Sequence, residues 1–409
     1  MNKVVVKLAS HDECTGCKAC SNACKLGAIT FEFDAEGFSY PKVSSDVCVN
    51  CGMCEKVCPI GKSTTNVTEN AIYYAGVSCD PNILNKSSSG GAFSAIAECI
   101  RVQNGFVVGC RFDEKMLPIH DIISPDEDYG CFRGSKYIQS DVGDVYRKVK
   151  ILLDDNRYVL FTGTPCQVAG LKMFLQKDYE RLFTVDLVCH GVPSSGLWEK
   201  HVAMLESSAG KRLRSFSFRA KKHSNSSLYY YSYDYGSKRQ MHGFARTDAY
   251  YAAFLDRKNY RNSCYVCQFA NDKRWGDFTI GDYWGVENYH QELNASTGVS
   301  ILIENSDKAK MLHIELKEHI LLIPTEKQNA IKFNANLVKP TIRPAERDSF
   351  YANVDVVGYE KWAEQYVREY KKSKAYYHEL LRMIIPKRIK KMIPLDIKKA
   401  ISELFVGEH

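Results

Sequence analysis

The sequence predicts a chain of mixed α/β class in three parts: a small cysteine-rich α+β domain over residues 1–65, a mixed α/β domain over 71–345, and a basic helical tail over 346–409. Three observations carry this prediction. Eight of the sixteen cysteines lie within the first 58 residues, in a repeated pattern. Apolar strand-like runs alternate with helical runs through the middle of the chain. Lys and Arg collect near the C-terminus.

The overall composition is that of an ordinary globular protein, with 409 residues, 45% hydrophobic and 25% charged. No apolar stretch is long enough to predict a membrane-spanning helix. The first residues, MNKVVVKLASHDEC, do not have the pattern of a signal peptide, so we expect a cytoplasmic protein. In a reducing compartment, patterned cysteines more often hold metal than form disulfides.

The net charge of +7 is concentrated in the tail. Between residues 371 and 400, ten Lys and Arg stand against Glu379 and Asp396, which gives +8 and leaves about −1 for the remainder. The basicity therefore gives no reason to expect nucleic-acid binding by the body of the protein.

Two cysteine runs define the N-terminal domain, CTGCKACSNAC from residue 14 and CVNCGMCEKVCP from residue 48. Both have the spacing Cys-x2-Cys-x2-Cys-x3-Cys of bacterial two-cluster ferredoxins, in which the fourth cysteine of each run ligates the other cluster. One predicted 4Fe–4S cluster takes Cys14, Cys17, Cys20 and Cys58. The second takes Cys48, Cys51, Cys54 and Cys24. Zinc is the alternative, but its sites normally use cysteine pairs separated by a longer gap.

The segment between the two runs predicts a β-hairpin. Residues 28–43 read AITFEFDAEGFSYPKV, which alternates apolar and polar side chains around a Glu-Gly turn.

Two glycine-containing loops are candidates for binding an anion. KSSSGG (86–91) precedes a predicted helix over 92–103 and a strand FVVGCRF over 106–112. Small residues at a helix N-terminus favour a phosphate group, although a simple serine cap explains the same pattern. GCFRGSKYIQS (130–140) brings Arg133, Lys136 and Tyr137 together, either as a clamp for an anionic planar cofactor or as a solvated loop.

A strand–helix–strand succession follows. RYVLFTGTPCQVAGLKMFL (157–175) predicts a strand and then a helix that starts near Cys166, and RLFTVDLVCHG (181–191) predicts a strand that ends at Cys189. Such a succession implies a parallel pair with a right-handed crossover. Both cysteines then lie at the carboxyl edge of the sheet, where open α/β sheets bind ligands.

Cys264 and Cys267 form a Cys-x-x-Cys pair far from the N-terminal runs. With Cys166 and Cys189 they provide four thiols, enough for a third 4Fe–4S cluster. A redox-active disulfide at Cys264 and Cys267 is the rival interpretation. The cysteines outside these sets are predicted to be core residues: Cys79, Cys99, Cys110 and Cys131.

The segment 212–260 is rich in tyrosine and alternates like β-strands, so we expect it to cover the site as a lid. WGDFTIGDYWG (275–285) predicts a strand flanked by Asp277 and Asp282, which either orient a ligand or cap turns. Candidate proton donors are chosen only because histidine titrates near neutral pH: His190, His223 and His242.

Six motifs together resemble the coenzyme F-420 hydrogenase/dehydrogenase beta-subunit family, in the version with an N-terminal two-cluster ferredoxin domain. They are SSGG (88–91), GSKYIQS (134–140), TPCQ (164–167), VCHGVPS (188–194), CYVC (264–267) and DFTIGDYWG (277–285). The resemblance covers residues 1 to about 330.

The resemblance implies an FAD-containing iron–sulfur oxidoreductase in which Cys166, Cys189, Cys264 and Cys267 hold a 4Fe–4S cluster beside the flavin. The residues that it implies for FAD binding are Ser89, Gly90, Gly91, Gly134, Ser135, Lys136, Tyr137 and Asp282. The resulting hypothesis is that reduced ferredoxin loads the N-terminal clusters, and that electrons pass through the third cluster to FAD and then to an organic substrate. The alternative is an electron-transfer subunit of a larger complex, with or without a deazaflavin coenzyme, that has no substrate of its own. A colourless redox-thiol protein is a third, more distant interpretation.

The tail over 358–405 shows apolar residues at helical spacing, interrupted by Pro386 and Pro394, with mostly positive charge on the other face. Four interpretations fit this pattern: binding to an anionic membrane surface, docking of an acidic ferredoxin, binding of a phosphorylated substrate, or packing on the body with a solvated basic face.

Overall fold

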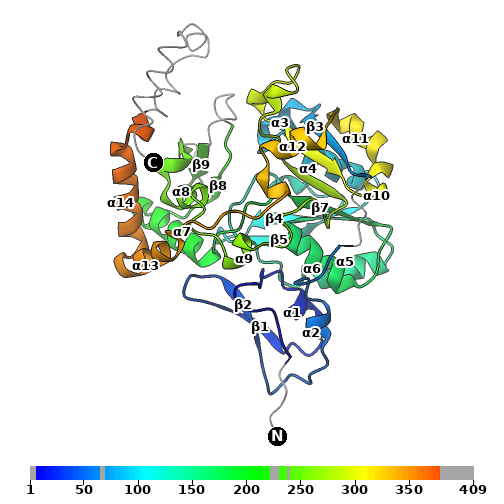
Figure 1. The fold of residues 1–409 in the computed structure, drawn as a ribbon, viewed down its shortest axis with the longest axis horizontal. Helices are drawn as coiled ribbons and strands as arrows, with labels where there is room; N and C mark the ends of the chain where they lie inside the picture. The colour runs from blue at the N-terminus through cyan, green and yellow to red at the C-terminus, as the bar shows by residue number, and fades with distance from the viewer. Residues whose placement is uncertain (1–5, 65–69, 222–229, 237–239, 378–409) are drawn as a thin grey trace.

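The computed structural model describes residues 6–64, 70–221, 230–236 and 240–377 and arranges them in three regions (Figure 1). The cysteine-rich N-terminal domain lies at one end of the molecule, below a large central sheet with its helices. A third region, with a small sheet and several helices, lies beside the central sheet.

The N-terminal domain contains the predicted hairpin. Strands β1 (Ile29–Phe33) and β2 (Ser39–Val43) pair antiparallel, with Phe31 opposite Pro41. Two short helices follow the cysteine runs, α1 (Ala19–Ala23) and α2 (Met53–Lys56). Each helix starts after a residue with positive φ, Lys18 and Gly52 respectively, which turns the chain sharply at the cysteine runs.

The central sheet has eight strands in the order β13-β3-β12-β11-β7-β6-β4-β5. Its strands are β3 (Ile72–Ser78), β4 (Phe106–Phe112), β5 (Pro118–Ile123), β6 (Val159–Gly163), β7 (Leu182–Leu187), β11 (Phe278–Asp282), β12 (Ser300–Glu304) and β13 (Ile320–Thr325). Strands β4, β6, β7 and β11 run parallel, which confirms the parallel pair predicted from the strand–helix–strand succession.

Helices cover both faces of this sheet. Successive residues of β6 alternate between two cores, since Leu160 packs with α4 whereas Val159 and Phe161 pack with α5 and α6. The helices that accompany the sheet are α3 (Pro81–Lys86), α4 (Ala92–Arg101), α5 (Val145–Asp154), α6 (Pro165–Leu175), α10 (Asp307–Met311), α11 (His313–His319) and α12 (Lys327–Lys332). The short helix α9 (Asn262–Tyr265) places Tyr265 in the core of the third region. The helix predicted over 92–103 and the strand predicted over 106–112 are therefore both present.

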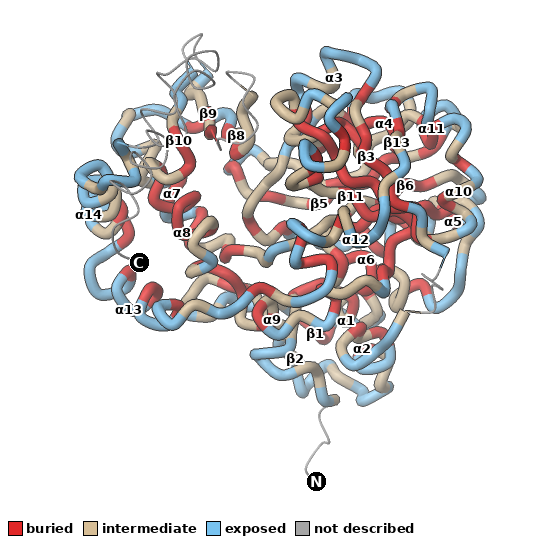
Figure 2. Tube along the Cα trace, turned by 45° about the horizontal axis from the view of Figure 1, so that its top comes forward, coloured by how far each residue is buried: buried red, intermediate tan, exposed pale blue. Residues whose placement is uncertain are grey.

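The third region is built around an aromatic core. Strands β8 (Ser215–Ser217), β9 (Tyr230–Asp234) and β10 (Met241–Phe244) form a small antiparallel sheet, as the alternation over 212–260 predicts. It packs with helices α7 (Ser195–Ala209), α8 (Ala249–Leu255), α13 (Arg347–Val357) and α14 (Tyr359–Lys372). Trp198 is fully buried between these elements, and Figure 2 shows extensive burial along α7 and α8.

The first part of the predicted tail thus packs on α7 and α8 and shares their core through Phe350, Tyr351 and Tyr359. Pro386, Pro394 and most of the basic residues of the tail lie outside the described residues. So does His223. Within the described part of the chain, none of the helices combines the length and the apolar character needed to cross a membrane.

Candidate functional site

The first predicted cluster site is a small cavity in the N-terminal domain. All four predicted ligands, Cys14, Cys17, Cys20 and Cys58, line this cavity of about 30 Å³, together with Phe31 and other side chains. The four cysteines are free thiols. Burial and the neighbouring Cys14 raise the pKa of Cys20 to about 12. A bound metal would deprotonate a thiol in this position, because coordination favours the thiolate.

The second predicted set, Cys24, Cys48, Cys51 and Cys54, lies in the same domain and includes the exposed Cys51. Backbone amides donate to two of its sulfurs, Ala28 N to Cys24 Sγ at 3.3 Å and Asn50 N to Cys48 Sγ at 3.4 Å. Amide donors of this kind stabilise thiolate ligands and tune the reduction potential of iron–sulfur clusters.

The structure brings the four predicted ligands of the third cluster together at the carboxyl edge of the central sheet. Cys166 lies in the first turn of α6, behind the Thr164–Gln167 capping box, and Cys189 follows the end of β7. Burial and then the nearby thiolate charge of Cys166 raise the pKa of Cys267 to about 11. After burial, Cys166 and Cys267 likewise raise the pKa of Cys189, and the pKa of Cys264 is raised by burial and by all three other thiols.

No three His, Cys, Asp or Glu side chains in the described ranges are arranged to hold a single metal ion. This is compatible with cluster binding, because each thiolate of a four-iron cluster binds a different iron atom and the four sulfurs do not converge on one point. In each of the three sets the donors are thiols, which is the donor type that iron–sulfur clusters require.

The first and third cysteine sets adjoin across α6. A Cβ atom added at Gly170 would lie 3.0 Å from Cys17 Sγ, so the backbone of α6 touches this cysteine directly. Cys166 lies one turn earlier on the same helix. The charge of Cys166 also raises the pKa of Cys17, in addition to the larger effect of burial.

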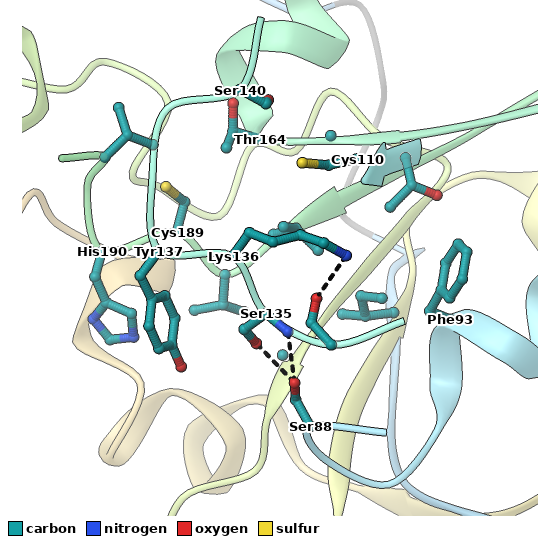
Figure 3. A pocket seen from close by; sticks show the side chains of 18 of the residues that line it. Ser88, Phe93, Cys110, Ser135, Lys136, Tyr137, Ser140, Thr164, Cys189 and His190 are labelled. Carbon is teal, nitrogen blue, oxygen red and sulfur yellow. Dashed lines mark hydrogen bonds between the residues drawn. The ribbon is translucent and has the colours of Figure 1, made fainter. Parts of the chain in front are cut away.

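A large cavity of about 470 Å³ opens beside the third set, with Cys166 and Cys189 in its wall. Its other walls come from the ends of β4, β6, β7 and β11 and from the two glycine-containing loops (Figure 3). These loops are joined to each other, since Ser135 N and Oγ lie 2.7 and 3.0 Å from Ser88 Oγ. The volume is within the range of cofactor sites.

Seven of the eight residues expected to bind FAD line this cavity: Ser89, Gly91, Gly134, Ser135, Lys136, Tyr137 and Asp282. Gly90 does not. A Cβ atom at Gly90 would lie 2.0 Å from Gly76 O and 2.6 Å from Ser300 N, so this glycine packs against strands β3 and β12. The absence of a side chain at Gly90 lets the loop lie close to the sheet edge, and the contact of this residue with a cofactor stays a prediction.

Lys136 and Tyr137 shape the cavity through contacts with the protein itself. The Lys136 ammonium group donates to Cys131 O at 2.9 Å, Arg133 O at 3.0 Å and Gly134 O at 3.3 Å, and its burial lowers its pKa. The ring of Tyr137 stacks on that of Phe254, with centroids 4.1 Å apart. The ammonium group therefore braces the loop from within, and the loop is not simply solvated.

The segment 212–260 reaches the cavity from the third region. Phe254, Leu255, Arg257 and Tyr260 line the cavity, and Arg219 donates to Asp282 Oδ2 at 2.6 Å. Lys221 Nζ donates to Leu84 O and Ser89 O, each at 2.6 Å. Arg219 and Lys221 were not singled out from the sequence, because nothing in RSFSFRAKK marks which of its cations meets a partner 63 residues away.

A buried polar network on the cavity wall was also missed. His120 Nε2 donates to Thr162 O at 3.1 Å, and His120 Nδ1 accepts from Ser140 Oγ at 3.0 Å. Gln167 Nε2 donates to the same hydroxyl at 3.0 Å. Burial lowers the pKa of His120 to about 4, so the ring is neutral near pH 7.

The two described histidine candidates differ in position. His190 lines the cavity beside Cys189, and burial lowers its pKa, so its ring is neutral (Figure 3). His242 lies on β10 and is not among the residues that line the cavity, and its role as a proton donor stays a prediction.

The prediction for the remaining cysteines was wrong in part. Cys99 is buried in the core as expected, whereas Cys79 and Cys131 are exposed and Cys110 lines the large cavity.

The cavity fits a flavin on the evidence of its lining. Ser and Gly backbone groups and the cations Arg133 and Arg257 suit phosphates, while Phe93, Tyr137 and Phe254 provide apolar and aromatic surface for a planar ring. The thiols of Cys166 and Cys189 in the same wall would put a third cluster next to that ligand.

Two segments of the chain match known protein families. Residues 156–328 match the family of the C-terminal part of the coenzyme F420 hydrogenase/dehydrogenase beta chain, and residues 13–62 match a 4Fe-4S dicluster domain. No curated protein matches the chain. Among solved structures, a chain of the F420-reducing NiFe hydrogenase complex from Methanosarcina barkeri is similar, with 14% identity over 74% of this chain and 92% of that chain and a TM-score of 0.42.

The two family matches confirm the resemblance seen in the sequence. The match over residues 13–62 indicates a 4Fe-4S dicluster domain at the N-terminus, and residues 156–328 are similar to the C-terminal part of coenzyme F420 hydrogenase/dehydrogenase beta subunits.

Proposed function

We propose that this chain is an electron-transfer subunit that conducts electrons between a protein partner and a redox cofactor in the large cavity. One observation carries the proposal: the first set of thiols adjoins the third across α6, and the third set has Cys166 and Cys189 in the cavity wall. The second set neighbours the first, since Cys54 acts on Cys20. The family description names a beta subunit, which supports a protein partner.

In this proposal the twelve cysteines hold three 4Fe–4S clusters: Cys14, Cys17, Cys20 and Cys58; Cys48, Cys51, Cys54 and Cys24; and Cys166, Cys189, Cys264 and Cys267. When bound, such clusters exchange single electrons, and a flavin exchanges electrons singly or in pairs. The chain's own residues place these groups. Helix α6 carries Cys166 at its N-terminus and presents Gly170 to Cys17, which holds the first and third sets close together.

We infer that the cofactor in the cavity is a flavin, with FAD as the expected form. Ser89, Gly91, Gly134 and Ser135 offer backbone and hydroxyl groups at the end of the cavity formed by the two loops. Tyr137 and Asp282 line the wall nearer to the third region. The neutral rings of His120 and His190 keep the wall uncharged at their positions near pH 7.

A ferredoxin-type donor is the partner that we propose for the N-terminal domain. The exposed Cys51 and the exposed apolar side chains Val47 and Val49 lie together in the second cysteine run, where an electron donor would approach. The basic tail is a second candidate docking element for an acidic ferredoxin or an anionic membrane surface, and its second half, residues 378–409, lies outside the described residues. The division into domains at 1–65, 71–345 and 346–409 belongs to the same proposal.

The second candidate function is a reductase with an organic substrate of its own. It is favoured by the contacts that the segment 212–260 makes at the cavity, through Arg219 and Lys221, since a purely conducting chain needs no such cover. Its catalytic residues are unassigned.

The test is to purify the protein without oxygen and to measure iron, sulfide and released flavin per chain. We expect about twelve iron atoms, as three four-iron clusters require, and one flavin. About eight iron atoms without flavin would contradict the proposal and leave a ferredoxin domain joined to another binding domain. A stoichiometric partner in the same preparation favours the electron-transfer role, whereas turnover of a small molecule by the isolated chain favours the reductase.

A further inference from the structure

Arg261 occupies the junction between the N-terminal domain and the rest of the molecule. Its side chain is fully buried, with 0% of the residue exposed. The guanidinium group donates to Cys14 O at 2.6 Å, to Gln139 Oε1 at 3.0 Å and to Ser39 O at 3.0 Å. It also lies 3.9 Å from the centroid of the Tyr40 ring. One side chain thus connects the first cysteine run, the hairpin β1–β2 and the loop 130–140 that lines the large cavity.

The charge of Arg261 is not neutralised by a carboxylate. Its three acceptors are neutral oxygens, and within the described part of the chain it forms no ion pair. The other two fully buried arginines differ in this respect. Arg274 pairs with Asp186 at 2.6 Å, and Arg347 places both terminal nitrogens 2.6 Å from the Glu36 carboxylate. A buried cation without a counter-charge is strongly unfavourable, so a negative group is expected beside Arg261.

Arg261 borders two predicted cluster sites, the first through its guanidinium group and the third through its backbone. At the first site is the carbonyl of Cys14, a predicted ligand of the first cluster, and the Cβ position of Gly16 lies 3.1 Å from Arg261 Nη1. The backbone of Arg261 borders the third site, since Cys264 N donates to the backbone carbonyl of Arg261 at 2.9 Å and Cys264 is a predicted ligand of the third cluster.

We propose that Arg261 is the shared counter-charge of the first and third cluster sites and raises the reduction potentials of both. The proposal rests on the cluster assignment made above. Thiolate-ligated iron–sulfur clusters are anionic and become more negative on reduction, and local net charge is one of the factors that set their potentials. A desolvated cation beside two such sites favours the reduced form of each, because the interaction is screened little in the interior. The hydrogen bonds of the Arg261 guanidinium group reach none of the second-site residues Cys24, Cys48, Cys51 and Cys54.

A functional consequence follows for the direction of electron transfer. We call the first and third cluster sites the inner sites and the second, which contains the exposed Cys51, the outer site. If the two inner sites are easier to reduce than the outer one, electrons that enter at the exposed second run collect beside the large cavity. Arg261 therefore acts as a positioning residue that fixes the domain junction. Its charge also favours electron transfer from the outer cluster toward the inner ones.

The test is a potentiometric titration of the anaerobically purified protein, followed by electron paramagnetic resonance of the cluster signals. Arg261→Met removes the charge and keeps most of the volume. We expect the equilibrium constant for one-electron reduction of both inner clusters to fall at least tenfold, which is about 59 mV, while the outer cluster is unchanged. Arg261→Lys keeps the charge and is expected to retain potentials close to those of the wild type.

Gln139→Glu provides a second variant in case Arg261→Met does not fold. It places a carboxylate against Arg261 Nη1 and is expected to lower the same two potentials by neutralising the cation. The matched control is the double variant Glu36→Gln/Arg347→Met, which removes a neutralised pair at the same junction and is expected to shift neither potential.

Unchanged inner potentials in Gln139→Glu, in a protein with its full iron content, would overturn the role of Arg261. So would an equal shift of all three clusters in Arg261→Met, because that result indicates a general structural change. A wild-type protein without the inner cluster signals would instead refute the proposed function itself.

Discussion

The sulfur of Cys17 and the backbone of Gly170 are in direct contact, because a methyl group at Gly170 would lie 3.0 Å from Cys17 Sγ. Gly170 is in the interior of α6, where glycine costs roughly 0.5–1 kcal/mol relative to alanine. The absence of a side chain at this position allows α1 of the N-terminal domain to pack on the helix that carries Cys166. The first and third cysteine sets are neighbours for this reason.

Substituting Gly170 by valine should therefore separate the two cysteine sets. We expect a loss of about 1–3 kcal/mol in the free energy of unfolding, the usual result of overpacking, and slower electron transfer from the N-terminal clusters to the cavity chromophore. Thermal unfolding and stopped-flow absorbance measure the two effects. Met173→Leu on the same helix is a volume-conserving control that should change neither. Wild-type transfer rates in Gly170→Val would show that this contact is not on the path.

Cys267→Ser should remove the third cluster and spare the other two. The serine variant is expected to keep about eight iron atoms per chain and an unchanged N-terminal cluster spectrum, because the two N-terminal sets have all their ligands. Reduction of the flavin by reduced ferredoxin should be abolished. Cys79→Ser is the matched control, since Cys79 is an exposed thiol outside the three sets. Undiminished electron flow to the flavin in Cys267→Ser would refute the third site.

Arg219→Met should weaken flavin binding. Asp282 lines the cavity, and without the guanidinium partner at 2.6 Å its negative charge faces an anionic dinucleotide. We expect a rise in the flavin Kd of at least tenfold, or about 1.4 kcal/mol, measured by fluorescence titration of the deflavinated protein.

The double variant Arg219→Met/Asp282→Asn should recover most of this loss, because it removes the uncompensated charge. Arg111→Met serves as the control, since Arg111 pairs with Asp121 at 2.7 Å and neither residue lines the cavity. Equal Kd values in the single and double variants would argue against an electrostatic role of the pair.

The buried His120 predicts a specific pH dependence of stability. Its pKa is lowered to about 4, below the value of an unfolded histidine, so at pH between about 4 and 6.5 the unfolded chain binds the additional proton. Stability therefore falls as the pH decreases through this window. From pH 7 to pH 5 the contribution is about 2 kcal/mol, from roughly 1.5 pKa units at 1.36 kcal/mol each.

His120→Gln lacks this titration and should lose correspondingly less stability over the same range, as measured by denaturant unfolding at pH 7, 6 and 5. Comparison with the variant is necessary because carboxylates titrate in the same range in both proteins. Parallel curves for the two proteins would mean that the ring is protonated in the folded state or exposed to water.

Spacing and periodicity within short segments were enough to predict the local features of this protein. They predicted the two-cluster ferredoxin pattern of the eight N-terminal cysteines. They also predicted the hairpin β1–β2 and the parallel strands β6 and β7 joined by α6. The same succession placed Cys166 and Cys189 at one edge of the sheet, because parallel strands end on the same side. These features depend on neighbours in the chain, which a single sequence displays.

Contacts between residues that are far apart in the sequence, in contrast, are visible only in the folded chain. The pairing of Arg219 with Asp282, the network around His120 and the position of Arg261 beside two cysteine sets join residues far apart in the sequence. Local patterns also could not distinguish Gly90, which packs on the sheet, from Gly91, which lines the cavity, or the exposed Cys79 from the buried Cys99. The physical reason is that burial and charge compensation depend on how separate segments pack, whereas propensity and spacing describe each segment alone.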